Sequence, residues 1–205
     1  MKRIGLISGL IMIFALVTIP LQAKEPRGLM KPIAPLMIEH RLIERMVTVM
    51  EESVSEKKVN PALADRVLDF FMIYGDKVHH GKEEDILFAA LAKKKLSPDH
   101  RKMLDTLLDE HVQARKKIAK LAEDREKYAK GNADTGASIL ITMNDLTVLY
   151  RKHIELEDRH FFIPSLGYFS KGEMDAMLNE MWEYDRNMIH VKYRDVVQKA
   201  GKTLK

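Results

Sequence analysis

"HHGKEEDILF", residues 79–88, places two histidines and three acidic residues in seven positions and then continues into three apolar residues. At α-helical spacing, His80, Glu84 and Leu87 fall on one face of a helix, because positions three and four apart are neighbours one turn on. A carboxylate that is buried without a partner is energetically costly. The stretch therefore predicts a helix that carries charged groups into a core, where something must neutralise them.

The same arrangement occurs a second time in the chain. "HGKEEDILF" (80–88) and "HIELEDRHF" (153–161) align without a gap, with His, three residues, Glu, Asp, two residues and Phe in both. His153 and Glu157 then occupy the positions of His80 and Glu84. Such a repeat is expected if a two-helix unit occurs twice and its copies meet at a shared site.

Helix caps divide the rest of the chain into segments. Asn60 and Ser97 each precede a proline, the order of an N-cap followed by the first helical residue. Ser170 and Glu173 have the spacing of a capping box, and strand signals are almost absent. The sequence predicts five helices, at about 33–56, 61–93, 98–129, 136–163 and 171–198. The resulting all-α fold is an up-down-up-down bundle over about 33–165, with an additional C-terminal helix at about 171–198.

One histidine falls about midway along the apolar face of each bundle helix, namely His40, His80, His111 and His153. A single histidine on such a face is usually a satisfied core residue. The alternative interpretation is that these side chains face water and the helix phases are wrong by a residue or two. Four histidines together with Glu84 and Glu157 instead favour two bridged cations at the bundle centre. The chain has no cysteine, so nitrogen and oxygen would hold the metal, a donor set that suits iron, manganese or zinc and, with open positions, non-heme iron.

The order H…HxxxE…H…HxxxE resembles the pattern of hemerythrin-like (HHE cation-binding) proteins. The resemblance covers about residues 30–165 and extends to the surrounding "LMIEHRLIERM", "LLDEHVQARKKI" and "HIELEDRHFFIP". It implies a four-helix bundle with two non-heme iron ions that bind dioxygen or a related small oxidant. By position, the implied terminal ligands are His40, His80, His111 and His153, and the implied bridging carboxylates are Glu84 and Glu157.

One position departs from the family pattern. Oxygen carriers of the family have five histidines, two of them a turn apart on the third helix. Here Arg115 stands one turn after His111, and a guanidinium cannot ligate a metal. The resemblance thus leaves one iron a ligand short. Glu44 on the first helix is favoured to fill the gap, and Tyr150 on the fourth helix is the alternative.

Two further pairs lie close to the implied ligands. Asp158 directly follows Glu157 and would replace it if the register slipped. His79 and Glu83 form an overlapping pair, but one residue turns an α-helix by about 100°. We therefore expect His79 and Glu83 beside the ligands or at the surface. Phe88 and Phe161, each one turn beyond a glutamate, are expected to wall the pocket and keep it dry.

The first 23 residues differ from the rest. Lys2 and Arg3 precede an uncharged apolar stretch over 4–21, and Ala23 leads into a polar segment. This layout favours a secretory signal over an uncleaved membrane anchor. Residues 1–23 are therefore assigned to a signal peptide or anchor, and 24–205 to one helical domain that is exported to the periplasm or secreted.

Charge and motifs limit the functional classes. The net charge is +4, but lysines and glutamates alternate without a basic block, which argues against nucleic-acid binding. The sequence favours an exported di-iron protein that binds dioxygen for storage, delivery or scavenging over an enzyme. The alternatives are a di-iron enzyme acting on peroxide or nitric oxide, and a metal-binding bundle without a redox role.

Overall fold

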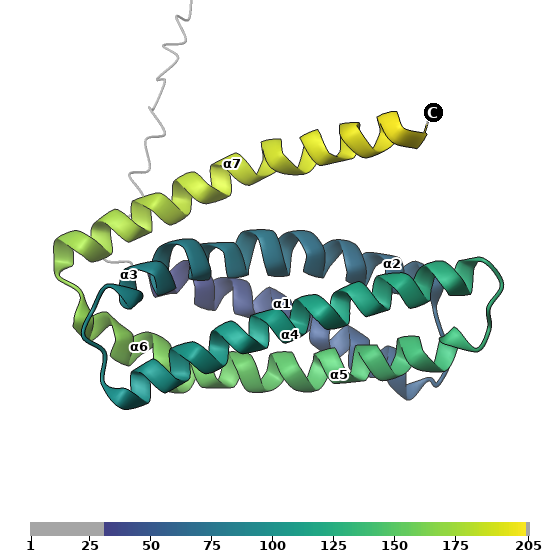
Figure 1. Cartoon of the computed structure of the whole chain (residues 1–205), viewed down its shortest axis with the longest axis horizontal. Coiled ribbons are helices and arrows are strands. Elements are labelled where there is room, and N and C mark those ends of the chain that lie inside the picture. Colours follow the sequence, from purple (N-terminus) through teal and green to yellow (C-terminus); the bar gives the residue numbers. More distant parts are fainter. Residues whose placement is uncertain (1–30, 204–205) are drawn as a thin grey trace, which may run out of the picture.

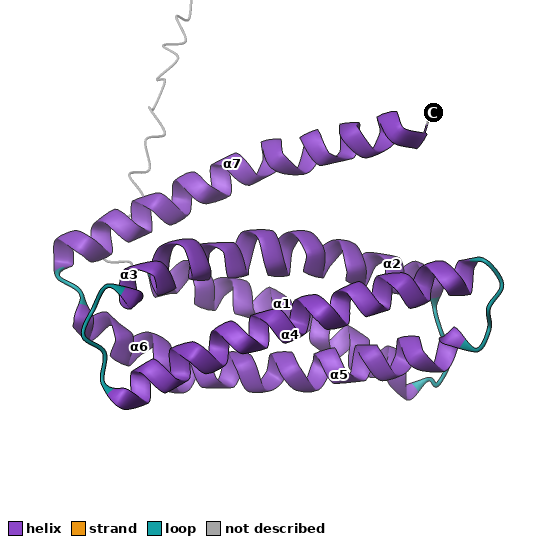
Figure 2. Cartoon of the chain, in the orientation of Figure 1, coloured by secondary structure: helices purple, strands orange, loops and turns teal. Residues whose placement is uncertain are grey.

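The computed structural model describes residues 31–203, in which all regular structure is helical (Figure 2). Four helical rods pack side by side in alternating directions, and a further helix, α7, runs along one side of them (Figure 1). The predicted all-α bundle with an additional C-terminal helix is confirmed. The segment predicted to be a signal or anchor, residues 1–23, lies outside the described residues.

The rods follow one another in chain order. Rod 1 is α1 (Ile33–Ser55), rod 2 is α2 (Pro61–Asp69), η1 (Phe70–His80), η2 (Glu83–Phe88) and α3 (Ala89–Ala92), rod 3 is α4 (Pro98–Ala129), and rod 4 is α5 (Thr135–Leu156), η3 (Glu157–Phe161) and α6 (Phe162–Ser165). The short η4 (Leu166–Tyr168) leads to α7 (Lys171–Thr203). The first residues of the four rods and of α7 agree with the predicted helix starts to within one residue. Among the helices described, none is both long and apolar enough to cross a membrane.

The predicted caps form. The Asn60 side chain accepts a hydrogen bond from the amide three residues later at 3.1 Å, and Ser97 does the same at 3.2 Å. The Glu173 carboxylate accepts from the Ser170 amide at 2.8 Å, and the Ser170 hydroxyl accepts from the Glu173 amide at 3.3 Å. Because these bonds satisfy amides that a helix start leaves free, they fix where rods 2 and 3 and α7 begin.

The apolar core is split into two clusters with a polar layer between them. On α1, Leu36 belongs to one cluster and Ile43 to the other. His40, one turn from each, lies fully buried between them. On each of the other three rods, polar side chains also separate residues of one cluster from residues of the other. All four rods therefore bring polar side chains to the same level of the bundle.

Rods 2 and 4 contain π-helical segments at the level of the polar layer, namely η1, η2 and η3. Buried residues of rod 2 recur every fourth position, at Val67, Phe71, Gly75, His79, Glu83, Leu87 and Leu91. On an α-helix, every fourth residue drifts by about 40° around the axis. The wider turn of a π-helix, with its i→i+5 hydrogen bonds, offsets this drift. Rod 2 can therefore keep His79 and Glu83 directed at the bundle centre.

Candidate metal centre

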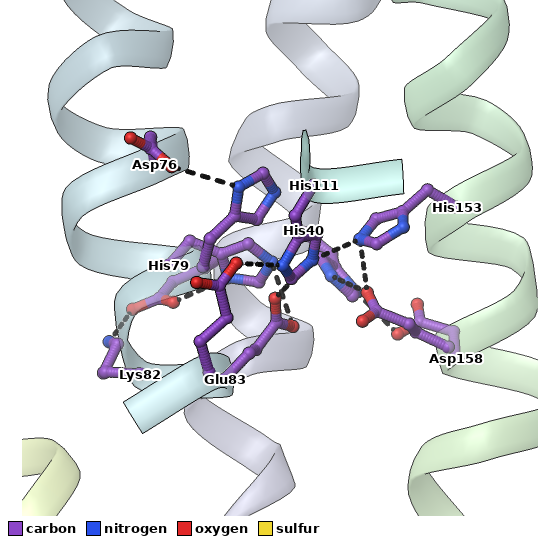
Figure 3. A network of polar contacts seen from close by, with 12 residues as sticks. His40, Asp76, His79, Lys82, Glu83, His111, His153 and Asp158 are labelled. Atoms are coloured by element: carbon purple, nitrogen blue, oxygen red, sulfur yellow. Dashed lines mark hydrogen bonds and ion pairs between the residues drawn. The ribbon is translucent and has the colours of Figure 1, made fainter. Parts of the chain in front are cut away.

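The polar layer consists of five histidines and two glutamates, each at most 1% exposed: His40, His79, His80, Glu83, His111, His153 and Glu157. Figure 3 shows five of them, His40, His79, Glu83, His111 and His153, pointing toward one another. Of the five histidines and two glutamates, rod 2 supplies three, rod 4 two, and rods 1 and 3 one each.

Their donor atoms form two groups that could each hold one ion. One group is His80, Glu83, His111 and His153, and the other is His40, His79, Glu83 and Glu157, with the donor atoms of each group all within 4.8 Å of one another. Glu83 belongs to both groups. Its Oε1 lies 3.3 Å from His79 Nε2, and its Oε2 lies 3.4 Å from His111 Nε2. The two oxygens of Glu83 therefore face one group each.

Glu157 links the two groups as well. Its Oε2 lies 3.2 Å from His40 Nε2 and 3.2 Å from His153 Nε2, and these two histidines belong to different groups. Both carboxylates thus lie where a bridging ligand between two adjacent ions would be placed.

An outer ring of carboxylates contacts the far side of the imidazoles. The distances from Nδ1 are 2.8 Å for His40 to Asp158, 3.0 Å for His79 to Glu39, 2.7 Å for His111 to Glu84 and 2.9 Å for His153 to Glu110. His80 Nδ1 lies 3.6 Å from Asp76. An Nδ1–H that donates to a carboxylate leaves Nε2 free to ligate and fixes the ring orientation. The ring of carboxylates therefore directs Nε2 inward.

Many donor atoms of the layer are buried without a hydrogen bond. They are Nε2 of His40 and His79, both ring nitrogens of His80, and all four carboxylate oxygens of Glu83 and Glu157. Each buried polar group left unpaired costs about 1–3 kcal/mol. Two divalent cations would satisfy the carboxylate oxygens and one nitrogen of each imidazole, and a set of imidazoles and carboxylates suits iron, manganese or zinc. The residues present therefore fit a two-metal centre.

The pKa values in the metal-free layer diverge strongly. Burial lowers the pKa of His40 and of His111, but the carboxylates hydrogen-bonded to each outweigh it and raise these pKa values to about 10 and about 9. Burial and the neighbouring His111 lower the pKa of His80 to about 4. Burial and the nearby Glu83 raise the pKa of Glu157. Protons thus occupy part of the layer, and a bound cation would displace them.

The structure brings five of the six residues that the resemblance implies as ligands into this layer: His40, His80, His111, His153 and Glu157. Glu84 is the exception, and its predicted position is corrected. Its side chain is 26% exposed, and its Oε1 accepts from Arg115 at 2.8 Å and lies 2.7 Å from His111 Nδ1. Glu83 stands at the centre instead, because the π-helical turns shift the phase of rod 2.

Two of the candidates for an additional ligand, Glu44 and Asp158, also lie outside the two groups. Glu44 is 38% exposed and pairs with Arg41 at 2.8 Å. Asp158 contacts His40 from the outer ring and does not replace Glu157. Tyr150 is fully buried, with its ring 4.5 Å from the ring of Phe71, and its hydroxyl makes no hydrogen bond. Its ring also stacks against the ring of His80 at 6.1 Å, so Tyr150 as an additional ligand stays a prediction.

The fifth histidine that the pattern lacked is present on rod 2. His79 was expected beside the ligands or at the surface, but it is buried within the second group. The signal that could have located it is the four-residue spacing of the buried positions in rod 2. Arg115, which replaces the usual histidine of the third helix, donates to Asp76 at 2.6 Å and to Glu84 at 2.8 Å. It therefore holds the outer carboxylates that face His80 and His111.

Aromatic rings enclose the layer on one side. Phe88 stacks on His111 with ring centroids 5.8 Å apart and meets Phe161 edge-on at 5.6 Å. Both were predicted to wall the site; Phe88 contacts a histidine of the layer directly, and Phe161 packs against Phe88. Phe162, which sequence reasoning did not single out, stacks on His40 at 5.6 Å. These rings are fully or almost fully buried and exclude water from that side.

An antiparallel helical bundle with a buried layer of imidazoles and bridging carboxylates defines a class of metal-binding bundles. Residues 31–162 match the family model of the hemerythrin HHE cation-binding domain. Because this match spans well over half of the chain, the protein belongs to the hemerythrin HHE family. Comparisons with curated proteins and with solved structures give no match. Helix α7 lies outside the matched residues.

Proposed function

We propose that this protein is an exported di-iron protein that binds dioxygen reversibly, for storage, delivery or local scavenging. The observation that carries the proposal is the bridged arrangement of the layer. Glu83 faces one histidine of each group with its two oxygens, and Glu157 lies 3.2 Å from a histidine of each group. Two adjacent ions need this kind of shared ligand.

The number of histidines favours oxygen binding over turnover. With four histidines, one iron would be a ligand short, and its open positions would favour chemistry on peroxide or nitric oxide. His79 supplies the fifth imidazole. A site with five imidazoles and two shared carboxylates holds its ions more completely, which supports reversible binding. The enzyme remains the second candidate.

The protein's own residues would do two things around the ions. The outer carboxylates hold four of the five imidazoles in the tautomer that presents Nε2 inward. Phe88, Phe161 and Phe162 exclude water, which protects a bound oxidant from protonation. When bound, two iron ions would supply the electrons for reversible reduction of dioxygen.

Anaerobic reconstitution with ferrous iron tests the proposal. We expect about two iron ions per chain, a count that follows from the two donor groups. On exposure to air, a visible absorption band should appear, and it should disappear again under argon over repeated cycles. The apoprotein carried through the same cycles is the control.

Other outcomes would favour the competing functions. Rapid bleaching with consumption of added peroxide supports the enzyme. Failure to take up iron, with uptake of zinc or manganese, supports a metal-binding bundle without a redox role. Export is tested separately by cell fractionation and by the N-terminal mass of the mature chain, which should begin after Ala23.

A further inference from the structure

Lys82 is a charged side chain with no exposed surface. A buried ammonium is destabilising unless carboxylates neutralise it and accept its hydrogen bonds. Two carboxylates do so here. The Lys82 ammonium donates to Glu39 Oε1 on α1 and, at 2.6 Å, to Asp185 Oδ1 on α7. Lys82 thus joins rod 1 and α7 from a position directly before the bridging residue Glu83.

The contact with Glu39 continues to a candidate ligand. Glu39 is itself buried, with its Oε1 on Lys82 and its Oε2 3.0 Å from His79 Nδ1. The four side chains form one line from α7 to the metal centre: Asp185, Lys82, Glu39 and His79. Figure 3 shows the inner part of this line, with Lys82 against the carboxylate beside His79.

Helix α7 also packs against rod 2 through Tyr184, which is adjacent in sequence to Asp185. The Tyr184 hydroxyl donates to the Lys77 carbonyl at 3.0 Å. A Cβ on Gly81 would lie 2.1 Å from the Tyr184 hydroxyl oxygen, so only glycine leaves room for this side chain. Figure 1 shows that α7 follows rod 2 near its start and diverges from the bundle toward the C-terminus. The contacts of Tyr184 and Asp185 therefore dock α7 at the level of the polar layer.

The other histidines have outer partners within the matched bundle. Asp158 contacts His40 and pairs with Arg41, while Arg115 holds the carboxylates facing His80 and His111. Among the contacts described for residues 31–203, only the line to His79 ends on α7. Among these described contacts, α7 is therefore connected to one donor group, through Lys82 and Glu39.

We propose that α7 contributes to metal binding through Asp185. Asp185 acts through Lys82 and Glu39 to position His79, and it thereby sets the affinity of the His40, His79, Glu83 and Glu157 group for its ion. The proposal rests on the two-metal centre of the proposed function. It makes Asp185 a positioning residue for one of the two ions.

A calorimetric titration of the anaerobic Asp185→Asn apoprotein with Fe²⁺ alone tests this role of Asp185. The substitution removes one charge and keeps the shape. Glu183→Gln is the matched control, because Glu183 is an exposed acid two residues away that pairs with Arg186 of the same helix at 2.5 Å. We expect Asp185→Asn to weaken one of the two binding steps about tenfold, the low end of the loss for outer partners of a ligating histidine. The other step, and both steps of Glu183→Gln, should match the wild type.

A double-mutant cycle with His79→Ala separates positioning from general destabilisation. If Asp185 acts through His79, Asp185→Asn should have no further effect on Fe²⁺ affinity in the His79→Ala background. Additive losses, or equal weakening of both steps, would overturn the proposal. The proposal would also be overturned if Asp185→Asn bound Fe²⁺ as tightly as Glu183→Gln while the wild type bound two ions. That result would leave the proposed function intact. A wild type that binds no Fe²⁺ would overturn both.

Metal binding should act back on α7, because coupling between two sites is reciprocal. Hydrogen exchange of the amides at 181–187 should slow when Fe²⁺ is added to the wild type. In Asp185→Asn, this slowing should be lost, whereas Glu183→Gln should keep it. Unchanged exchange in the wild type on Fe²⁺ binding would contradict the coupling.

Discussion

Exchanging each of two adjacent glutamates for glutamine tests the phase of rod 2. Glu83 belongs to both donor groups, so Glu83→Gln replaces a carboxylate that both ions would share by a neutral amide. Within residues 31–203, the polar partners of Glu84 are the outer nitrogen of His111 and the guanidinium of Arg115. The same chemical change, one residue apart, should therefore have very different consequences for iron binding.

The expected magnitudes follow from these positions. With iron at about 100 times the Kd of each site, binding stabilises a protein by about 2.7 kcal/mol per site, and therefore by about 5.4 kcal/mol when two sites are filled. For a chain of this size, loss of the stabilisation from both sites lowers Tm by roughly 11–22 °C, at about 2–4 °C per kcal/mol. Glu84→Gln instead removes an outer partner, which weakens one site about 10- to 100-fold. At the same iron concentration, that site would remain about half to nine-tenths filled.

Metal analysis and thermal unfolding with and without iron measure both effects. We expect Glu83→Gln to bind well below two iron ions per chain and to lose most of the Tm increase that iron gives the wild type. Glu84→Gln should retain between about one and a half and two ions at that concentration. If Glu84→Gln lost its iron and Glu83→Gln kept two ions, the reasoning from the π-helical phase would be refuted.

Three further predictions concern charge, pH and packing. Glu157→Ala should reduce the iron content below two and destabilise the protein by about 3–5 kcal/mol, because it leaves buried imidazoles unpaired; retention of two ions would contradict this. The pKa values of His40 and His111 are raised from 6.5 to about 10 and 9 on folding, so their protons stabilise the metal-free protein fully below pH 6.5. The Tm measured in chelator should accordingly fall as pH rises from 6.5 to about 10, and a flat or rising Tm would oppose the assignment. Gly81→Ala should destabilise the wild type in urea by expelling Tyr184, but should stabilise a Tyr184→Ala background by about 0.5–1 kcal/mol; destabilisation in both would show that the ring contact is not the cause.

Much of the fold could be predicted because its boundaries depend on local chemistry. Asn60, Ser97 and Ser170 satisfy the free amides of the helices that follow them, and their side-chain bonds form as the sequence indicates. The histidines on rods 1 and 3 could also be found, because His40 and His111 lie on α-helices with regular spacing. For these two rods, the count of 3.6 residues per turn holds through the polar layer.

The same count fails on rod 2. It assigns His80 and Glu84 to the inner face and excludes His79 and Glu83, because adjacent residues of an α-helix point about 100° apart. A π-helical turn is not fixed by the propensity of the residues within it. It depends on what the surrounding rods require of the side chains, which local sequence does not contain. The four-residue spacing through Phe71, Gly75 and His79 is a trace of this requirement, but an apolar stripe alone does not distinguish it from a drifting α-helical face.

The irregular turn and the complete donor set have the same origin. His79 belongs to one group and His80 to the other, although the two residues are adjacent in the chain. An ideal α-helix could direct only one of them at the centre, and rod 2 would then supply one imidazole and one carboxylate. The wider turn directs both imidazoles and Glu83 inward, so rod 2 supplies the fifth histidine while Arg115 stands on α4 where the family resemblance implied one. It also turns Lys82 into the interior, where Asp185 of α7 meets it. The connection between α7 and the metal centre is therefore a consequence of the same change of phase that completes the ligands.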